Sequence, residues 1–426
     1  MIKIKKNWML FLLLFLSAIS CEDEPPVVPP PPPPPVYKDT ITLSFEDVTH
    51  RSITVNIKTT VNNPKSTIKF FRIYNSSETQ VTEYPITASD TSIIDEGLQL
   101  NTTYTYYAVR IDTTGERKDS SNIVEARTLA ATSFNYTWQE FSIGEWNSVL
   151  YDVWGTVENN VYACGTIMIN DTIAYGILKW NGVEWLPEKE IGGLLTIYGF
   201  SSSDIWAVGG GVWYYNGIEW EEYTYRDPVI TNNISYSSVW GTSSNNLYFG
   251  NVGGKIIHWD GSNSEIVYTN PDIVQVSDLD GYSADFIIGV GRGFTPPLLA
   301  VSYNGVSWSR LTIENDPLIN SAAIVSKNHI YFGGTGVYEL KWNNFYRIFT
   351  SGYYISDIEY NRQTGVTVAA GHFDGVYINN GLEWRDYRSQ ITSDDTDYPG
   401  VFLINNTIFC VGSTINEAKI IIGKNN

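Results

Sequence analysis

The sequence predicts an all-β protein with two folded parts, a β-sandwich followed by a ring of seven β-sheets. Three observations lead to this prediction. A unit of roughly forty residues recurs six times between Asn147 and Trp384, and such a period is typical of propellers, solenoids and other arrays. Short runs of alternating apolar and polar residues fill the segment before these repeats. The composition, 43% hydrophobic and 14% aromatic with 35 glycines, is typical of folded β structure rather than disorder.

The first twenty residues are expected to direct export. Three lysines within the first six residues precede an apolar run from Trp8 to Leu16, which is too short for a membrane-spanning helix. Residues 16–21, Leu-Ser-Ala-Ile-Ser-Cys, resemble the bacterial lipobox, in which the cysteine receives a lipid and becomes the first residue of the mature protein. The resemblance implies a signal peptide over residues 1–20 and lipidation at Cys21.

A stiff spacer is expected over residues 21–36. An acidic triplet, Glu22 to Glu24, follows the cysteine, and nine prolines lie between Pro25 and Pro35. Polyproline II rises about 3.1 Å per residue, so this proline stretch spans roughly 34 Å. The triplet is similar to the signals by which some Gram-negative bacteria move lipoproteins to the outer leaflet, and a solvated charge run is the alternative. The expected localisation is therefore the outer membrane, lipid-anchored and surface-exposed.

The net charge argues against one class of partner, and the cysteine positions argue against a disulfide bond. The 27 Lys and Arg residues against 46 Asp and Glu residues give a net charge of −19, which repels a phosphate backbone and argues against nucleic acid. Membrane contact is expected through the lipid anchor only. Besides Cys21, the chain has Cys164 and Cys410, which would lie on neighbouring blades. Packed sheets stand about 10 Å apart, beyond the roughly 7 Å that a disulfide allows between Cα atoms, so two free buried thiols are expected.

Residues 37–129 are predicted to form the sandwich. Seven short runs alternate apolar and polar residues, as in Ile41, Leu43 and Phe45. The stretch 98–109 resembles the E–F corner of fibronectin type III domains, where a leucine lies six residues before a tyrosine. The resemblance makes Tyr104 the corner residue, whose hydroxyl binds the backbone, although Ile57 replaces the usual tryptophan of the B strand. Such a domain is expected to act as a spacer.

Residues 130–426 are predicted to form a seven-bladed β-propeller. Four units carry an Asn-Gly turn, which favours a type I′ hairpin, and a tryptophan follows three residues after the glycine. The regular recurrence of these tryptophans predicts packing between blades at Trp185, Trp220, Trp308 and Trp384. Inner strands are expected to start near Tyr151, Thr196, Ser238, Ser277, Ala322, Ser356 and Gly400. The last blade lacks an outer strand, which residues 135–141 can supply, closing the ring.

The repeat itself is similar to Trp-Gly-type propeller repeats of secreted bacterial proteins, as residues 198–209 illustrate. It departs from the WD40 pattern, which needs Gly-His and Trp-Asp pairs, and it is only distantly similar to the sialidase Asp-box. Taken with the lipobox and the corner tyrosine, the chain resembles a bacterial lipoprotein with a fibronectin type III-like domain and a seven-bladed β-propeller. A propeller fold by itself implies no particular function.

No catalytic residues are predicted. The four histidines, His50, His258, His329 and His372, lack metal-ligand spacing, and no Gly-x-Ser-x-Gly motif occurs. One column of inner-strand positions is expected to converge on the central channel: Asp152, Thr196, Ser238, Asp278, Ala323 and Asp357. The three aspartates Asp152, Asp278 and Asp357 could hold a hydrated calcium ion, and solvated carboxylates are the alternative. No other cofactor is expected.

The predicted ligand-binding residues are aromatic and arginine side chains on loops over the rigid ring, where a glycan or a protein can be gripped. They are Tyr223, Tyr225, Arg226, Phe294, Tyr353, Tyr354, His372, Phe373, Tyr387 and Arg388. The expected function is a lipid-anchored, non-catalytic binding or interaction protein at the cell surface. The alternatives are a polysaccharide lyase or glycoside hydrolase that uses the channel carboxylates, and an assembly factor that faces the periplasm.

Overall fold

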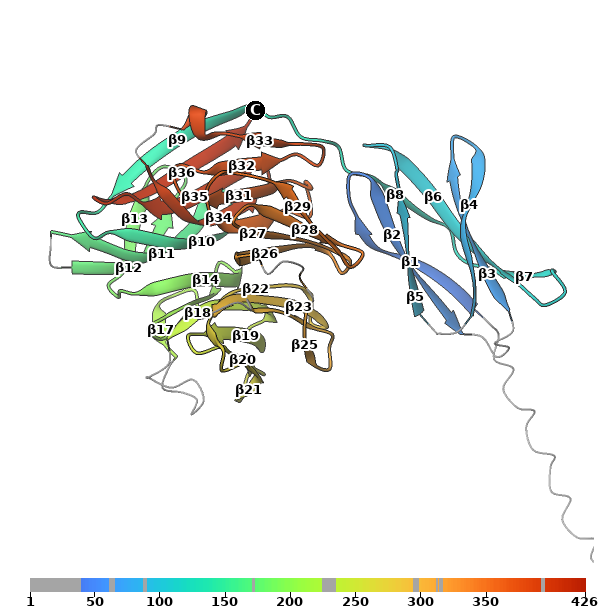
Figure 1. Cartoon of the computed structure of the whole chain (residues 1–426), viewed down its shortest axis with the longest axis horizontal. Helices are drawn as coiled ribbons and strands as arrows, with labels where there is room; N and C mark the ends of the chain where they lie inside the picture. Colours follow the sequence, from blue (N-terminus) through green and yellow to red (C-terminus); the bar gives the residue numbers. More distant parts are fainter. Residues whose placement is uncertain are drawn as a thin grey trace, which may run out of the picture.

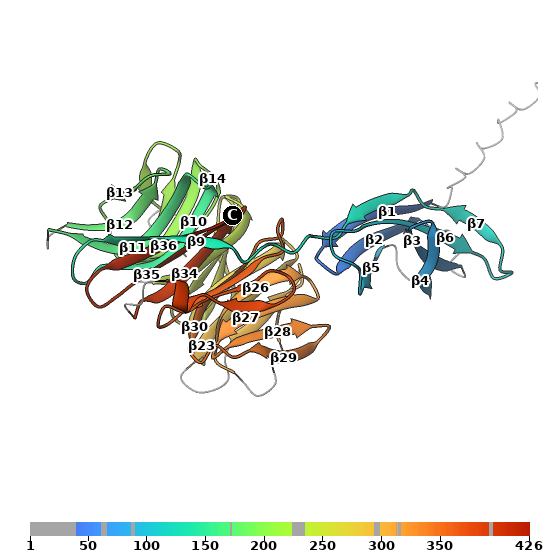
Figure 2. The same ribbon diagram turned by 90° about the horizontal axis from the view of Figure 1, so that it is seen from above.

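The computed structural model describes residues 40–60, 66–86, 90–170, 173–223, 235–293, 299–311, 313, 317–391 and 395–426. The predicted signal peptide, Cys21 and the spacer lie outside these residues. The described chain forms two β parts joined by an extended linker (Figures 1 and 2). Its one helical element is the short 3-10 helix η1, Arg388–Gln390. Within the described residues, no helix has the length and apolar character needed to span a membrane.

The N-terminal part consists of two sheets around one core. Its strands are β1 Thr40–Val48, β2 Ser52–Thr60, β3 Thr67–Tyr74, β4 Ser77–Pro85, β5 Asp90–Glu96, β6 Thr103–Ile111, β7 Arg117–Ser120 and β8 Val124–Arg127. One sheet has the order β1-β2-β5 and the other β4-β3-β6-β7, with β8 also paired to β6. Ile57 lies in the core between them. The Tyr104 hydroxyl accepts a hydrogen bond from the backbone N–H of Gln99 at 2.9 Å, as the corner motif predicts.

The C-terminal part is a ring of four-stranded antiparallel sheets, or blades, and seven such blades occur in the described residues. Blades 1 to 3 comprise β10 Val149–Val157, β11 Asn160–Ile169, β12 Ile173–Trp180 and β13 Trp185–Lys189; β14 Leu194–Ser201, β15 Asp204–Gly209, β16 Val212–Tyr215 and β17 Trp220–Glu222; and β18 Tyr236–Ser243, β19 Asn246–Asn251, β20 Lys255–Trp259 and β21 Ser264–Thr269. In each blade the first strand is the innermost, next to the central channel.

Blades 4 to 7 continue the same order around the ring. They comprise β22 Ile273–Ser283, β23 Phe286–Gly293, β24 Leu299–Tyr303 and β25 Trp308–Arg310; β26 Ile319–Ser326, β27 His329–Gly334, β28 Val337–Lys341 and β29 Asn344–Phe349; β30 Ile355–Tyr360, β31 Thr367–Gly371, β32 Val376–Asn379 and β33 Trp384–Asp386; and β34 Asp397–Ile404, β35 Thr407–Ser413, β36 Ala418–Asn425 and β9 Tyr136–Ile143. The outermost strand of blade 7 is β9, which precedes blade 1 in the sequence. The ring is therefore closed as predicted, by antiparallel pairing of β9 with β36.

The recurring tryptophans pack between blades, as their regular spacing predicts. Each lies at the start of an outermost strand and contacts an aromatic ring on the second strand of the preceding blade. The pairs and their centroid distances are Trp185 with Phe409 at 6.3 Å, Trp220 with Tyr162 at 6.5 Å, Trp308 with Tyr248 at 6.1 Å and Trp384 with Tyr331 at 6.2 Å. These tryptophans thus serve the structure of the ring.

The Asn-Gly turns differ from the predicted type I′ geometry. In the first of them the positive φ falls on Gly182 (+96°) and not on Asn181, whereas a type I′ turn needs it at both central residues. The Asn181 side chain instead accepts hydrogen bonds from the N–H groups of Val183 and Glu184, both at 2.9 Å. The asparagine therefore caps the turn through its side chain, which sequence alone does not distinguish from a backbone role.

The two cysteines are free and buried, as predicted. They do not face each other across the gap between blades 7 and 1. Cys164 packs with residues of blade 2 such as Ile197, whereas Cys410 packs with residues of blade 6 such as Val376. Both thiols therefore point away from the blade 1 to blade 7 boundary.

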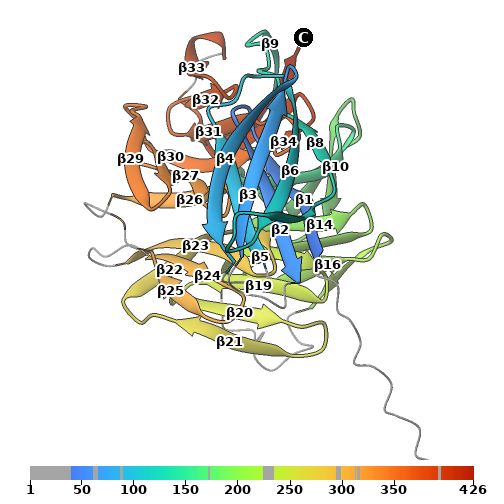
Figure 3. The same cartoon turned by 90° about the vertical axis from the view of Figure 1, so that its right-hand side faces the viewer.

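The sandwich lies across one face of the ring, at the ends of blades 4, 5 and 6 (Figure 3). We call this the lower face, where the innermost strands end. Tyr282 donates a hydrogen bond to the backbone oxygen of Glu46 at 2.9 Å, and Lys341 lies 3.1 Å from the carboxylate of Glu96. The upper face, where the innermost strands begin, lies on the other side of the ring and is free of the sandwich.

Candidate functional site

A repeated β-bulge shapes the upper mouth of the central channel. Near the start of every innermost strand the pairing with the second strand skips one residue, or two residues in blade 7. A bulge changes the direction in which the side chain of the unpaired residue points. Seven bulged residues, one from each blade, line a single cavity of about 490 Å³: Tyr151, Leu195, Ser237, Ser277, Asn320, Ser356 and Pro399.

The residue after each bulge forms a second layer that includes the predicted aspartates. This layer contains Asp152, Thr196, Ser238, Asp278, Ser321, Asp357 and Gly400. The sequence prediction placed Ala323 here, but the register puts Ser321 at this position. Ala323 is buried and packs with blade 6 residues such as Ile358. The error arises because blade 5 has Ala322-Ala323-Ile324 where blades 1 and 3 have Val-Trp-Gly, so the sequence does not mark the position in this blade.

The three aspartates of this layer each bind the next blade. Asp152 accepts a hydrogen bond from the backbone N–H of Ile197 in blade 2 at 2.9 Å. Asp278 accepts from Ala322 N–H in blade 5 at 2.9 Å, and Asp357 accepts from Val401 N–H in blade 7 at 2.8 Å. These N–H groups belong to buried innermost strands and need an acceptor. The aspartates therefore hold the ring together around the channel.

Ser321 joins two of these carboxylates. Its hydroxyl lies 3.0 Å from Oδ2 of Asp278 and 2.7 Å from Oδ1 of Asp357. It also accepts a hydrogen bond from the backbone N–H of Ile358 at 3.2 Å. Small hydroxyl residues in this layer are thus inter-blade linkers, a role that no short motif in the sequence indicates.

Burial and mutual repulsion raise the pKa of these carboxyl groups. Desolvation, followed by the charge of Asp357, raises the pKa of Asp278 to about 7. The same two causes raise the pKa of Asp152 well above its ordinary value. Desolvation also raises the pKa of Asp357. The layer therefore carries less negative charge near neutral pH than its three aspartates suggest.

The arrangement does not fit the predicted calcium ion. No group of three or more His, Cys, Asp or Glu side chains in the described part of the chain is placed to bind a metal. The physical reason is that Asp152 and Asp357 accept backbone N–H bonds with both oxygens, and Asp278 accepts one through Oδ2. Oxygens held in this way are directed at the strands and not at a common ion in the channel.

Two acidic residues that the sequence analysis missed lie deeper in the channel. Asp280 and Glu359 line an inner cavity of about 150 Å³ together with Trp154, Tyr198 and Trp240. Desolvation raises the pKa of Asp280 to about 6, and desolvation with nearby aspartates raises that of Glu359 well above its ordinary value. Asp280 follows Asp278 by two positions, and Glu359 follows Asp357 by two positions. Residues two positions apart on a strand point to the same side, so this spacing was the signal in the sequence.

The upper mouth brings together five of the ten predicted ligand-binding residues. Tyr353 and Phe373 are 42% and 49% exposed, and their ring centroids lie 5.1 Å apart. The guanidinium of Arg388 lies 5.0 Å from the centroid of Tyr353. Tyr354 and His372 line the 490 Å³ cavity, with ring centroids 5.6 Å apart. These five residues form the rim cluster of blade 6.

The structure also places Arg292 and Gln275 on the wall of this cavity, which the sequence analysis did not select. Arg292 Nη2 donates a hydrogen bond to the Gln275 side-chain oxygen at 2.8 Å. Arg292 is exposed and gives the wall a cation opposite the acidic layer. Its place in a glycine-rich strand gave no signal for a binding role.

Two predicted binding residues are structural. Tyr387 is fully buried, contacts Tyr136 and Trp138 of β9, and donates a hydrogen bond to the backbone oxygen of Phe134 at 2.8 Å. Tyr223 packs against Trp206 and Trp259 between blades 2 and 3. Tyrosines in these loops were assigned to the surface because they interrupt the repeat, yet the cores between blades extend under the loops. Tyr225, Arg226 and Phe294 lie outside the described residues.

Comparisons with known proteins support the fold and no particular family. No family model matches the sequence. No curated protein matches it either. Among solved structures, the chain is similar to YCF48 bound to D1 peptide, with a TM-score of 0.52 and 11% identity over 70% of this chain and 97% of the other. It is also similar to the WD40 β-propeller domain of Doa1, with a TM-score of 0.51 and 14% identity over 69% and 98%. At these identities the likeness concerns the fold alone, and the larger part of this chain is a β-propeller.

Proposed function

We propose that this protein is a non-catalytic binding protein that engages a protein partner at the upper mouth of its propeller. One observation carries the proposal. The exposed rings of Tyr353 and Phe373 lie beside a polar cavity of about 490 Å³, on the face opposite the sandwich. Exposed aromatic side chains with a neighbouring arginine are enriched at the centres of protein interfaces.

The position of the sandwich supports the choice of face. Contacts through Glu46 and Glu96 hold the sandwich against the lower ends of blades 4 and 5. A partner that approaches the lower mouth would meet the sandwich first. Among the described residues no domain covers the upper mouth, and its bulged residues supply hydroxyl and amide groups from several blades. A partner segment entering there could contact many blades at once.

The similar propeller YCF48 is bound to a peptide, which supports a protein ligand for this chain as well. A glycan is the second ligand class for the same surface, because exposed aromatic rings also stack on sugars. The alternative function as a lyase or glycoside hydrolase has less support. The channel carboxylates that it would use accept backbone hydrogen bonds between blades.

We further propose that the propeller is presented at the cell surface by a lipid on Cys21, a proline spacer and a fibronectin type III-like sandwich. The lipobox of residues 16–21 supports the anchor. The sheet orders β1-β2-β5 and β4-β3-β6-β7, with the bonded Tyr104, support the domain type. Cys21→Ser should release the protein from outer-membrane fractions. If the variant fractionates with membranes as the parent does, the anchor is wrong.

Selection from a displayed peptide library tests the binding proposal, with residues 37–426 as bait and a glycan array in parallel. Enriched peptides should bind at least tenfold more weakly to the double variant Tyr353→Ala/Phe373→Ala, because the two rings supply the exposed contact area. The matched control is Tyr346→Ala, which removes a tyrosine 52% exposed on the outermost strand of blade 5. Equal loss in the control, or full binding by the double variant, contradicts the proposed site. Enrichment of glycans alone would change the ligand class.

A further inference from the structure

A buried histidine of the sandwich inserts into the lower face of the propeller. His50, on the turn between β1 and β2, is only 5% exposed although it lies at the surface of its own domain. Its ring fits between Gly365 and Gly381, which belong to two turns on the lower end of blade 6. A methyl group at either glycine would collide with the imidazole. The slot therefore exists only because both positions lack a Cβ atom.

The other contacts between the two parts are a partly buried hydrogen bond from Tyr282 to the backbone oxygen of Glu46, the buried carboxyl group of Asp47 near Arg362, and exposed ion pairs. Lys341 pairs with Glu96 at 3.1 Å, Lys327 lies 3.9 Å from Glu46, and both lysine side chains are more than one third exposed. Surface pairs of this kind contribute little, about 0 to 1 kcal/mol each. The histidine is thus the most buried polar side chain of this interface among the described residues that form it.

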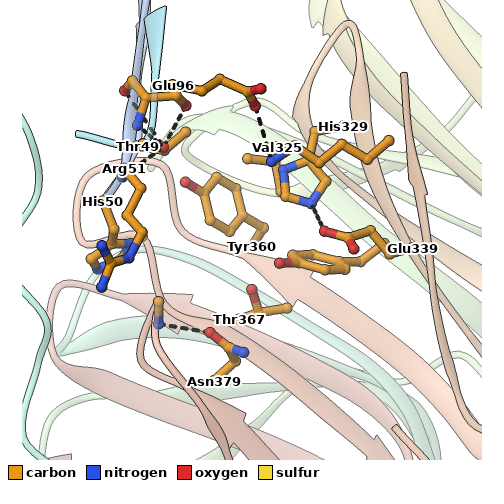
Figure 4. Close-up of a pocket in the computed structure, with 16 residues that line it drawn as sticks. Thr49, His50, Arg51, Glu96, Val325, His329, Glu339, Tyr360, Thr367 and Asn379 are labelled. Carbon is orange, nitrogen blue, oxygen red and sulfur yellow. Dashed lines mark hydrogen bonds and ion pairs between the residues drawn. The ribbon is translucent and has the colours of Figure 1, made fainter. Parts of the chain in front are cut away.

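A pocket of about 390 Å³ lies beside the histidine, between the sandwich and blades 5 and 6 (Figure 4). Its far wall carries His329, whose Nε2 lies 2.7 Å from a carboxylate oxygen of Glu339. Nε2 of His50 is buried without a hydrogen-bond partner among the described residues. A proton added to this nitrogen would have neither a partner nor bulk water to stabilise its charge.

We propose that His50 is a pH-sensitive latch, which keeps the sandwich docked over the lower mouth of the propeller while it is neutral and releases the sandwich when it is protonated. Release would uncover the lower mouth, where Arg362 stacks on Tyr282 with its guanidinium 4.6 Å from the ring centroid. The latch concerns the lower face and is independent of the binding proposed for the upper mouth.

The groups around His50 determine whether docking of the sandwich weakens or strengthens as pH falls. Desolvation lowers the pKa of His50, a backbone hydrogen bond to Ala130 partly offsets this, and the charge of Arg51 lowers the pKa further. The turns of blade 6 that enclose the ring place glycine backbone against it. Beyond the pocket, blade 5 carries His329, Glu339 and Lys341. The released state then binds the proton more tightly, so docking weakens as pH falls below about 6.5 until the lowered pKa is reached.

Asp47 acts in the opposite sense at lower pH. Burial in the same interface raises its pKa, and the charge of Arg362 lowers it by a smaller amount. Protonation of Asp47 therefore favours docking as pH falls toward its ordinary value. The two effects oppose each other, so the test compares pH 7.5 with pH 5.5, which lies below the ordinary pKa of histidine and above the ordinary pKa of Asp47, 3.8.

Small-angle X-ray scattering of residues 37–426 at the two pH values measures docking directly. The maximum dimension should increase at pH 5.5 in the parent chain. At pH 5.5, about one unit below the ordinary histidine pKa, the docking constant should fall by up to about tenfold. His50→Gln, which cannot be protonated, should remain compact at both values, and His329→Gln should respond as the parent does. Gly381→Ala places a methyl group in the slot and also strains the turn, where φ is +90°, so it should be extended at both values.

Several outcomes would overturn the latch. A parent chain with the same dimensions at both pH values contradicts it, whatever the variants do. A transition that persists in His50→Gln, or one that disappears in His329→Gln, assigns the response to another group. If His50→Gln is extended at both pH values, the parent chain is compared with Gly381→Ala. A parent that reaches the dimensions of Gly381→Ala at pH 5.5 supports the latch, and a parent that stays compact contradicts it. Peptide binding at the upper mouth is measured separately and does not enter this result.

Discussion

At the scale of single residues, the aspartates around the channel bind neighbouring blades together. Their recurrence in the sequence did not indicate this structural role. Asp278 and Asp357 accept backbone N–H groups from the next blade and are linked through Ser321. A carboxylate in this position meets the demand of a buried donor. Its ionisation is then unfavourable, because burial and a neighbouring aspartate both oppose the charge.

This leads to a prediction about pH. The pKa of folded Asp278, about 7, lies above the ordinary value of 3.8. The folded state therefore binds the proton more tightly, and the propeller should lose stability as pH rises from about 4 through 7. The melting temperature of the propeller should be higher at pH 5.5 than at pH 8, and Asp278→Asn should reduce that difference. The exposed Glu184→Gln serves as control. An unchanged pH difference in Asp278→Asn would show that this carboxyl does not titrate as described.

Tyr387 gives a second prediction at this scale. Because it is fully buried against β9 and bonded to Phe134, Tyr387→Ala should cost about 3 kcal/mol or more of unfolding free energy. Tyr387→Phe keeps the ring and should cost only about 1 kcal/mol. Denaturant unfolding measures both. A loss within about 0.5 kcal/mol for Tyr387→Ala, as for a surface residue, would contradict its place in the ring closure.

At the scale of elements, β9 is the strand on which the ring depends. It precedes blade 1 in the sequence and completes blade 7 through eight paired positions with β36. Without it, β36 would be an open edge with unpaired N–H and C=O groups. Trp138 and Tyr136 would leave the core that they share with Tyr387.

Truncation tests this dependence. A chain that begins at residue 144 lacks β9, whereas one that begins at residue 133 keeps it, and both lack the sandwich. The shorter chain should aggregate or melt about 10 °C or more below the longer one, at roughly 2 to 4 °C per kcal/mol for a domain of this size. Calorimetry and size-exclusion chromatography provide the readout. Equal melting temperatures with monodisperse elution of both chains would contradict closure by β9.

The blades and their closure could be predicted because they follow from repetition. Asn-Gly turns, recurring tryptophans and an incomplete last unit are local signals that reappear along the chain. The residues that line the upper mouth were identified only in part. The bulges, which decide the residues that line the mouth, have no fixed motif. In blade 5 the Val-Trp-Gly sequence is also missing, so Ala323 was predicted at the position that Ser321 occupies. Burial of Tyr387 depends on β9, which is about 250 positions away, so no local pattern reveals it.

At the scale of the whole molecule, the two faces of the propeller are unequal. The sandwich covers the lower mouth through the latch residue His50 and the Glu46 and Glu96 contacts. The upper mouth combines a polar cavity with the exposed rings of the rim cluster. A chain tethered through its N-terminal part would then offer its upper mouth to partners and keep its lower mouth covered.

Hydrogen–deuterium exchange of residues 37–426, with and without a peptide enriched from the library, tests the proposed binding face most directly. Exchange should slow in residues 351–357, 371–376 and 275–278, which border the upper mouth. Exchange should not change in residues 181–184, 216–219 and 304–307, which form turns on the lower face. Protection of the lower turns or of the sandwich, with unchanged exchange at the upper mouth, would show that the upper mouth is not the binding face.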